Sequence, residues 1–485
     1  MFCQLIYLRR CIPGRIRRAL DELPETLDET YARSLEEIDE QNREYAHRLF
    51  QCVAAASRPL HVNELAEFLA FDFEAGSTPT FLADWRPEDP THTVLSVCSS
   101  LLAVVESDGG APTAPVVQFA HFSVKEYLTS ARLAKATTTI SRLHVSMTRA
   151  HTIIAQACLG VLLHLDQSIT EDDLEKFPLA EYAAEHWVSH ARFEDVSSEV
   201  QDGMKRLFDP NKHHLFVWIR IHDPCPEGFW DISSRSERAV QARAIPLHYA
   251  ACCGIHDVAT FLIVERSQDV NARGFTDEEA PLHVASRHGH ADVAQLLLEH
   301  GADADARDKS SNIWSPLEWA AYLEHVEVAQ VLLEHGADVR AQGLHDWTPL
   351  HYAQGEGVTR VLLKHGADAN VQDSNGLPPL HKATNMGRVG TVRALLEYGV
   401  DANARDANNT TPLHLATDEG GPDFVQLLLQ YGADIHAQDD MGWTPFMRAT
   451  EDRRNGIMAS LLEYGAEDHR TVSELGTRRG SERLS

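Results

Sequence analysis

Two histidines, His186 and His190, stand four residues apart, a spacing that places two metal ligands on one face of a helix. Trp187 and Val188 lie between them, and no third ligand follows at a motif spacing. We therefore expect these histidines to pack within the fold and not to bind a metal.

The eight cysteines contain no Cys-x-x-Cys pair, the spacing of zinc and redox motifs. Cys252 and Cys253 are adjacent, and neighbouring cysteines rarely have the geometry of a disulfide. We expect them to be buried or half-buried thiols near the end of a helix. The apolar surroundings of most cysteines favour a reducing compartment.

Motifs for nucleophilic, metal-dependent and nucleotide chemistry are absent from the sequence. There is no Gly-x-Ser-x-Gly, no His-Glu-x-x-His and no deaminase pattern. Gly109-Gly110 and Gly355-x-Gly357 lack the lysine of a phosphate-binding loop. The sequence therefore predicts a protein that is not an enzyme, with no catalytic residues, no cofactor and no metal.

Composition and charge favour a globular protein with protein partners. The chain has 485 residues, of which 43% are hydrophobic, and 72 acidic residues against 43 basic ones give a net charge of -29. This charge repels a phosphate backbone, so we expect no nucleic-acid partner. The apolar runs at 5–8 and 94–105 are too short for a membrane span, and the first precedes its arginines, unlike a signal peptide. We expect no membrane partner and a cytoplasmic location, with the nucleus as the alternative.

A Pro-Leu-His motif, reduced to Pro-Leu in the third copy and replaced by Pro-Phe in the seventh, recurs through the C-terminal half at intervals of 30 to 35 residues. Its prolines are Pro246, Pro281, Pro316, Pro349, Pro379, Pro412 and Pro445. Threonine before the proline predicts a helix N-cap, proline suits the first helical position, and a glycine predicts the end of each helix. One such helix pair cannot bury both of its faces, so the copies must stack.

The repeat resembles the ankyrin repeat, whose signature is Thr-Pro-Leu-His-x-Ala. The resemblance covers seven copies over 243–467, with the first and last as caps, and implies a concave binding face made of turns and first helices. Glu318 replaces the motif histidine in the third copy. The fourth copy lacks three residues near 354–357, so we expect a tight and locally weak turn there.

Histidines fill two repeat positions, and both favour a structural role. One set follows the Pro-Leu pair, where a ring can bridge neighbouring turns. The other set precedes the final glycine, near a helix C-terminus that favours a cation. The members are His248, His283, His351, His381 and His414 in the first set, and His300, His335 and His365 in the second.

The N-terminal half does not repeat, and its pattern predicts mainly helices. They are expected at about 13–21, 24–38, 40–57, 63–69, 93–100, 122–128, 147–165, 178–191, 196–208 and 211–220. Pro24 is expected in the first turn of the second helix, and Asn63 is expected as an N-cap. Two β-rich runs, 101–106 and 115–120, flank the turn residues 107–110 and predict a hairpin. Helices followed by a two-stranded wing are typical of a winged helix.

Three segments carry a second resemblance: 20–31, 58–66 and 121–128. They are similar to the region that follows the nucleotide-binding NACHT domain in fungal NACHT–ankyrin proteins, including a winged helix of the GPI-inositol-deacylase-like type. The resemblance covers about 2–225 and implies a signalling architecture of switch, relay and repeat sensor. The phosphate-binding motif of that switch is missing, so we expect either a natural truncated relative or a sequence that has lost its upstream part.

A winged helix could bind DNA, but its charges oppose this function. The arginines at 9–18 precede the winged helix, while Glu64 and Glu67 stand in the helix that would face the phosphates. We therefore expect the winged helix to pack within the protein.

The sequence as a whole predicts a mostly α-helical protein, with a helical and winged-helix part followed by an ankyrin α-solenoid. The expected divisions are a post-NACHT helical segment at 1–57, a winged helix at 58–135, a helical connector at 136–230, the repeats at 243–467 and a polar tail at 468–485. The predicted function is binding of a partner polypeptide. The alternative is a fragment or regulator of a NACHT-type ATPase in a fungal immunity or incompatibility-like response, with an intact NACHT relative as partner.

The expected partner-binding residues lie in the turns and at the ends of the first helices. Tryptophan and tyrosine are favoured anchors of interfaces, although the same tryptophans could instead stiffen adjacent turns. Aromatic residues bordered by acids would suit a partner with basic or apolar side chains. The candidates are Trp314, Tyr322, Trp347, Asn385, Met386, Asp418, Glu419, Asp440, Met441 and Trp443.

Overall fold

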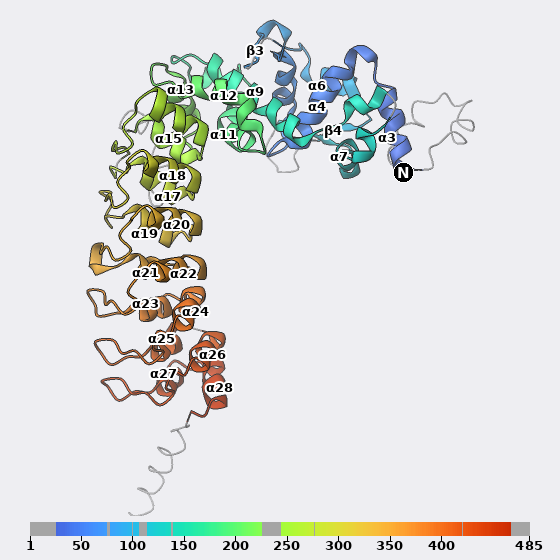
Figure 1. Cartoon of the computed structure of the whole chain (residues 1–485). Coiled ribbons are helices and arrows are strands. Elements are labelled where there is room, and N and C mark those ends of the chain that lie inside the picture. Colours follow the sequence, from blue (N-terminus) through green and yellow to red (C-terminus); the bar gives the residue numbers. More distant parts are fainter. Residues whose placement is uncertain are drawn as a thin grey trace, which may run out of the picture. The chain divides into compact units, whose positions relative to one another are not determined.

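The computed structural model describes residues 26–74, 78–98, 100–105, 114–136, 139–225, 244–275, 277–419 and 421–466. The chain divides into two compact units, Met1–Gln241 and Ala242–Ser485, and Figure 1 shows their elements. The helix expected at 13–21, the hairpin turn at 107–110 and the tail at 468–485 lie outside the described residues.

The first described helix of the N-terminal unit, α3 (Leu27–Glu36), starts at a capping box. The hydroxyl of Thr26 accepts a hydrogen bond from the Glu29 amide at 3.2 Å, and the Glu29 carboxylate accepts one from the Thr26 amide at 3.4 Å. The prediction of a start at Pro24 was therefore wrong, because reciprocal capping places the first turn after Thr26. A 3-10 turn, η2 (Glu40–Asn42), leads into α4 (Arg43–Ala55).

The winged-helix region contains the two predicted β-runs and three short strands that the sequence did not reveal. The strands β4 (Leu102–Val105) and β5 (Val116–Phe119) pair antiparallel, and β1 (Leu60–His61) adds to the other side of β5. A second, two-stranded sheet joins β2 (Phe71–Asp72) to β3 (Thr80–Phe81). The remaining elements are α5 (Val62–Glu67), η3 (Phe68–Ala70), η4 (Ala83–Trp85), α6 (Pro90–Cys98) and α7 (Phe122–Leu128).

The start of α5 differs from the prediction that Asn63 is its N-cap. His61 is the N-cap, and its amide donates to the Glu64 carboxylate at 2.7 Å. Asn63 lies inside the helix because β1 holds His61 in the extended conformation that a cap requires. Glu67 is also buried, and its carboxylate accepts from the Leu179 amide at 2.7 Å, which ties α5 to the helices that follow.

The connecting helices pack around α9 (Met147–His164), which contacts α4, α11 (Ala180–Ala191) and α12 (Val196–Leu207). Trp187 and Trp218 are fully buried and meet edge to face with ring centroids 5.2 Å apart. The Trp218 indole donates to the Ala184 carbonyl at 2.8 Å, so its polar atom is satisfied. The other elements are α8 (Ala131–Ala134), η5 (Thr139–Leu143), α10 (Glu171–Leu174) and α13 (His214–Ile221).

The C-terminal unit is a row of seven helix pairs, which Figure 1 shows as stacked rungs with turns at one edge. The first helices pack side by side: α15 (Pro246–Cys253), α17 (Pro281–His288), α19 (Pro316–Tyr322), α21 (Pro349–Tyr352), α23 (Pro379–Asn385), α25 (Pro412–Glu419) and α27 (Pro445–Glu451). The second helices are α16 (His256–Thr260), continued by η6 (Phe261–Glu265), then α18 (Ala291–Glu299), α20 (Val326–Glu334), α22 (Glu356–Lys364), α24 (Val389–Glu397), α26 (Pro422–Gln430) and α28 (Asn455–Glu463).

Local sequence explains these helix boundaries. Each motif proline occupies the first position of its helix, where its missing N–H leaves no hydrogen bond unmade. Gly301 and Gly336 end second helices with φ of +88° and +91°, a left-handed conformation that favours glycine. The leucines between these signals are buried, and Leu297 and Leu428 have no exposed surface. The predicted stacking of the copies is confirmed.

The short fourth repeat is reinforced by its neighbour, which the sequence did not predict. Glu324, from the third repeat, accepts hydrogen bonds from the amides of Gly357 and Val358 at 3.0 and 3.2 Å. A carboxylate therefore caps the N-terminus of α22 from outside the repeat. A Cβ atom added at Gly355 would lie 2.5 Å from the carboxyl carbon of Glu324, so any side chain there would collide with it. The tight turn is thus held by a contact between neighbouring repeats. The expectation of a locally weak turn did not take this contact into account.

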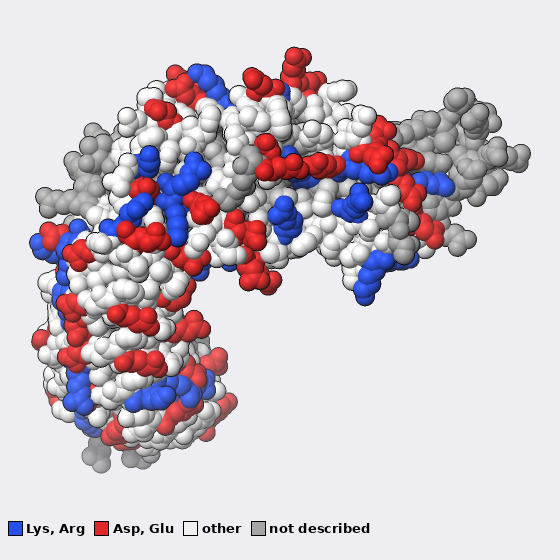
Figure 2. Space-filling model, turned by 45° about the horizontal axis from the view of Figure 1, so that its top comes forward, with Lys and Arg blue, Asp and Glu red and all other residues white. Residues whose placement is uncertain are grey.

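Acidic side chains are spread over the repeats in the view of Figure 2. Among the described residues, no helix has both the length and the apolar character needed to cross a bilayer.

Candidate protein-binding face

The motif histidines join each repeat to the next and are not free for chemistry. In the fourth repeat, His351 Nδ1 accepts from the Thr348 amide at 3.1 Å, and Nε2 donates to the Leu377 carbonyl of the fifth repeat at 3.2 Å. His248, His283, His381 and His414 make the same type of inter-repeat hydrogen bond through Nε2. Burial lowers the pKa of His283 to about 3, so this ring stays neutral. The predicted bridging role is confirmed.

The cap threonines act differently from the prediction. The hydroxyls of Thr348 and Thr411 bond the Nδ1 atoms of the motif histidines at 3.0 and 2.8 Å. Thr444 keeps the expected role and accepts from the Met447 amide at 3.3 Å, because no histidine follows it in that repeat. The histidine ring thus replaces a backbone amide as the partner of the cap hydroxyl.

The third repeat uses an ion pair where the other repeats use histidine. The carboxylate of Glu318 is fully buried and accepts from the Ser315 amide at 2.7 Å and from Arg307 at 2.6 Å. Arg307 also donates to the Gln342 carbonyl of the next repeat at 3.4 Å. Because a glutamate cannot donate to that backbone, Arg307 makes the inter-repeat bond instead.

Five aromatic residues gather on the first helices and turns of the third and fourth repeats, and we call them the aromatic cluster. Trp314 lies at its centre, with ring centroids 4.3 Å from Trp319, 5.0 Å from Tyr322 and 4.8 Å from Tyr352. Trp347 meets Tyr352 edge to face at 5.0 Å. Contacts of this kind stabilise beyond the area they bury.

The members of the aromatic cluster differ in exposure. Trp314 is only 5% exposed, so it packs the turn and offers almost no surface to a partner. Tyr322 is 40% exposed, and Trp319 and Trp347 are half-buried. Tyr322 and Trp347 therefore form the accessible rim of the cluster.

Two buried aspartates hold the indoles of the aromatic cluster. Asp308 accepts from Trp319 Nε1 at 3.2 Å, and Asp373 accepts from Trp347 Nε1 at 3.0 Å. Both carboxylates also accept hydrogen bonds from backbone amides of their own turns. Asp308, for example, accepts one from the Trp314 amide at 2.7 Å. The rings are fixed in place by these bonds, as a preformed binding surface requires.

Cations lie over two of these rings. Lys382 Nζ is 4.1 Å from the centroid of Trp347, and the Arg287 guanidinium carbon is 5.7 Å from that of Trp319. Burial lowers the pKa of Lys382, while Asp373 acts to raise it. Trp319, Tyr352 and Lys382 occupy the same repeat position, directly after that of the motif histidine. The sequence analysis did not name them as candidates. Aligning the repeats on their Pro-Leu pair would have found all three.

The fifth repeat adds apolar surface beside Lys382. Met386 lies one turn further along, at the end of α23, and is 48% exposed, and Asn385 beside it is also exposed. The two candidates at the end of this helix are thus accessible to a partner.

The candidates in the sixth and seventh repeats form a separate, polar group. Arg448 donates to Asp418 at 2.9 Å and to Asp439 at 2.7 Å, so Asp418 is engaged within the fold. Burial acts to raise the pKa of Asp439, but the hydrogen bonds from Arg448 and from two backbone amides outweigh it, and the pKa is lowered. Met441 is 81% exposed and Asp440 is exposed at the tip of the turn.

Trp443 and Glu419 are the two remaining residues that the sequence predicts to bind a partner. Trp443 is half-buried, and its carbonyl accepts from His414. The side chain of Glu419 lies outside what the structure describes.

The histidines with metal-like spacing are engaged in the fold. His190 is fully buried and bonds His151 Nδ1 at 2.8 Å and the Tyr182 hydroxyl at 2.8 Å. Burial lowers its pKa to about 3. His186 stands one turn earlier on α11, and burial lowers its pKa as well. Both rings therefore favour the neutral state.

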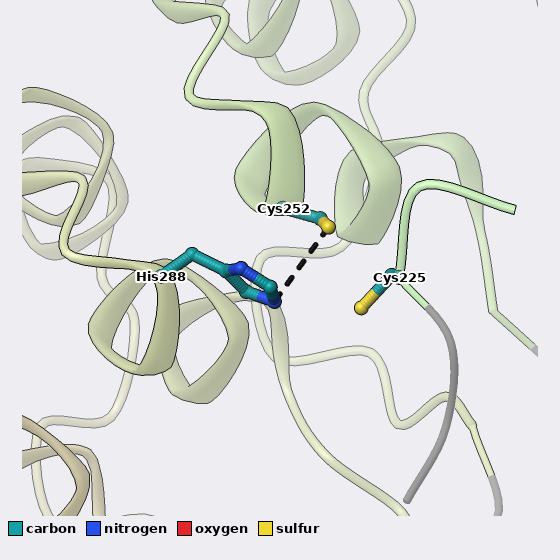
Figure 3. A group of neighbouring side chains, drawn as sticks. All are labelled: Cys225, Cys252 and His288. Carbon is teal, nitrogen blue, oxygen red and sulfur yellow. Dashed lines mark hydrogen bonds between the residues drawn. The ribbon is translucent and has the colours of Figure 1, made fainter. Parts of the chain in front are cut away.

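The adjacent cysteines Cys252 and Cys253 are buried near the end of α15, as predicted. Figure 3 shows the His288 ring pointing toward the Cys252 thiol, with Nε2 3.6 Å from Sγ. Both side chains come from the ends of first helices, in the first two repeats.

Family comparisons agree with this architecture. Ankyrin repeats match residues 247–343, 340–406 and 399–471. The winged helix domain of GPI inositol-deacylase matches residues 35–138.

Two fungal relatives match parts of the chain. Azaphilone pigments biosynthesis cluster protein L of Monascus ruber is 31% identical over 256 residues, which cover 52% of this chain and 53% of that protein. Vegetative incompatibility protein HET-E-1 of Podospora anserina is 22% identical over 238 residues, which cover 45% of this chain and 16% of that protein. The matches thus span about half of the first relative and a smaller part of the second.

Solved ankyrin domains are similar over the repeat unit. The ankyrin repeat domain of human ASB11 covers 46% of this chain and all of its own, with 26% identity and a TM-score of 0.42. The ankyrin repeat domain of Bcl-3 covers 45% of this chain, with 26% identity and a TM-score of 0.38. From the repeat motifs and the family matches, the chain carries a winged helix domain of the GPI-inositol-deacylase type followed by ankyrin repeats, and about half of its length is similar to each of these two fungal proteins.

Proposed function

We propose that this chain is a non-catalytic interaction protein that binds a partner polypeptide on the concave face of its ankyrin repeats. The accessible rim of the aromatic cluster, Tyr322 and Trp347, carries this proposal together with the exposed Met386 of the fifth repeat. Large side chains held in place on a rigid scaffold are typical anchors of protein interfaces. Ankyrin repeats indicate protein–protein interaction, and their fold is typically not enzymatic.

Capture of partners by variants of the full chain tests this function. The chain is immobilised, and proteins retained from an extract of the source organism are compared by mass spectrometry. Tyr322→Ala with Met386→Ala removes two partly exposed side chains, so the specific partner should be lost. Because Tyr322 packs against Trp314, circular dichroism and melting check that the variant is folded.

A control variant removes two accessible tyrosines elsewhere on the repeats. Tyr398 and Tyr431 are 59% and 41% exposed and follow second helices, away from the ends of the first helices. Tyr398→Ala with Tyr431→Ala should therefore retain the partner. Equal capture by the wild type and the Tyr322–Met386 variant, with both folded, would refute the concave face as the binding site.

The similarity to a vegetative incompatibility protein supports a second candidate function. According to this second candidate, the chain regulates or forms part of a NACHT-type signalling ATPase in an immunity or incompatibility-like response. Co-purification with an intact NACHT relative from the same organism tests this candidate. A relative whose ATP hydrolysis is unchanged by an excess of the chain, and which does not co-purify, would contradict it.

A further inference from the structure

Lys382 is a cation held mainly by an aromatic ring. Its ammonium lies 4.1 Å from the centroid of Trp347, and among the described residues it makes no hydrogen bond or ion pair. Cation–π attraction of this kind is worth about 0.5–2 kcal/mol, depending on desolvation. The ring face of Trp347 thus already accommodates an ammonium group.

The neighbouring rings extend this surface. Tyr322 stands nearly perpendicular to Trp314, at an interplanar angle of 88°, and Trp347 stands at 65° to Tyr352. Rings at steep angles present more than one π-face or edge to the same point, which is the arrangement that recognises ammonium ligands. Tyr322 and Trp347 are the accessible rings of these two pairs, and the pairs are joined by the contact of Trp314 with Tyr352.

Buried carboxylates strengthen the preference for a cation. Asp308 and Asp373 accept the indole N–H groups of Trp319 and Trp347, and no basic side chain among the described residues forms an ion pair with either. A carboxylate at the indole nitrogen raises the electron density of the ring, and its charge attracts a cation through a weakly polar medium. Asp373 attracts Lys382 in this way, while the buried Arg388 repels it. The net charge of -29 acts in the same direction at long range.

We propose that the rim of the aromatic cluster, Tyr322 and Trp347, binds the ammonium group of a lysine side chain on the partner polypeptide, and that Lys382 occupies this place in the free chain. The inference rests on the proposed function and specifies its partner as a segment with an exposed lysine. When the partner binds, its ammonium displaces Lys382 from the ring, and the released Lys382 returns to water.

Binding of two small probes to the full chain tests the inference. Tetramethylammonium chloride, with sodium chloride at equal ionic strength as the reference, reports ammonium binding through the fluorescence of the tryptophans. A short lysine-containing peptide and the same peptide with norleucine report whether the charge is needed. Wild-type protein should prefer the lysine peptide by about two- to thirtyfold, the range that one cation–π contact supplies.

Removing the resident cation gives the sharper result. Lys382→Met keeps an apolar stem over Trp347 but vacates the ammonium position, so both cationic probes should bind about three- to tenfold more tightly. Tyr322→Ala, made in the Lys382→Met background, should cancel this gain. Circular dichroism and melting of each variant confirm that the fold persists.

Three outcomes would overturn the inference. One is equal affinity for the lysine and norleucine peptides. Another is no gain in Lys382→Met. The third is a glutamate peptide that binds the wild type and is lost in Lys382→Met, which would make Lys382 itself the anchor of an acidic partner. The proposed function survives any of these if the Tyr322–Met386 variant still loses its partner, so the two failures are distinguishable.

Discussion

The fifth repeat contains a hydrogen-bonding defect that a single substitution should repair. Its first helix is capped by Pro378, which has no N–H, and His381 Nδ1 is buried without a hydrogen-bond partner among the described residues. In the fourth repeat, the equivalent atom is His351 Nδ1, and it has hydrogen bonds with both the amide and the hydroxyl of Thr348. Pro378→Thr should supply the same two donors, and Pro378→Ala should supply the amide alone.

The backbone geometry at this position accepts either substitution. Pro378 has φ -69° and ψ 162°, close to the φ -95° and ψ 166° of Thr348. Giving a partner to a buried acceptor is worth about 1–3 kcal/mol. Loss of the proline restriction on the unfolded chain costs about 0.4–1 kcal/mol. We therefore expect Pro378→Thr to stabilise the fifth repeat by about 1 kcal/mol, and Pro378→Ala to stabilise it by less.

Hydrogen exchange measured by mass spectrometry is the suitable assay, because the chain has two units and global unfolding need not be two-state. Amides of α23 and α24 should exchange about fivefold more slowly in Pro378→Thr, which corresponds to about 1 kcal/mol. Amides of α11, in the other unit, serve as an internal reference and should not change. Faster exchange in α23 for Pro378→Thr than for Pro378→Ala would refute the reasoning about His381.

Three further predictions concern the stability of both units. Leu297→Ala should cost about 2–5 kcal/mol in free energy of unfolding, seen as a lower urea midpoint at unchanged slope, and an unchanged midpoint would contradict its place in the core. Burial lowers the pKa of His248 to about 4 and those of His190 and His283 to about 3, so the unfolded chain binds protons that the folded chain does not once the pH falls below 6.5. Stability should therefore drop by up to about 1.4 kcal/mol per pH unit for each ring between pH 6.5 and 4, and equal urea midpoints at pH 7 and pH 5 would argue against it. Glu324→Ala should cost about 1–2 kcal/mol through loss of the α22 cap, measured as faster amide exchange in α22, whereas Glu324→Gln should retain part of the cap.

The sequence predicted the repeat unit well because its signals are local. A proline at the first helical position and a glycine after the last turn act on the backbone within a few residues. The candidate face was predicted less well. Tyr322 and Met386 are exposed as a binding role requires, but Trp314 is buried, and Asp418 is engaged by Arg448. Exposure depends on how the turns stack, which no single repeat encodes.

The N-terminal unit shows the same division. The helices and the two main strands follow from hydrophobic periodicity, while β1 forms only because Leu60 pairs with Val117, far along the chain. That pairing extends His61 and so moves the helix start away from Asn63. Local rules favoured asparagine as the N-cap, but the strand pairing selects His61, a residue that these rules do not favour.

By itself, the sequence determined the fold class, the starts of the first helices in the repeats and the bridging role of the motif histidines, because each depends on residue types at short, fixed spacings. Only the tertiary structure decided that Glu324 caps a helix in the next repeat and that Lys382 lies over Trp347. Both contacts join residues more than thirty positions apart that meet only when the repeats are stacked. Stacking brings such side chains together at a distance and angle that depend on every intervening turn, and periodicity alone does not specify them.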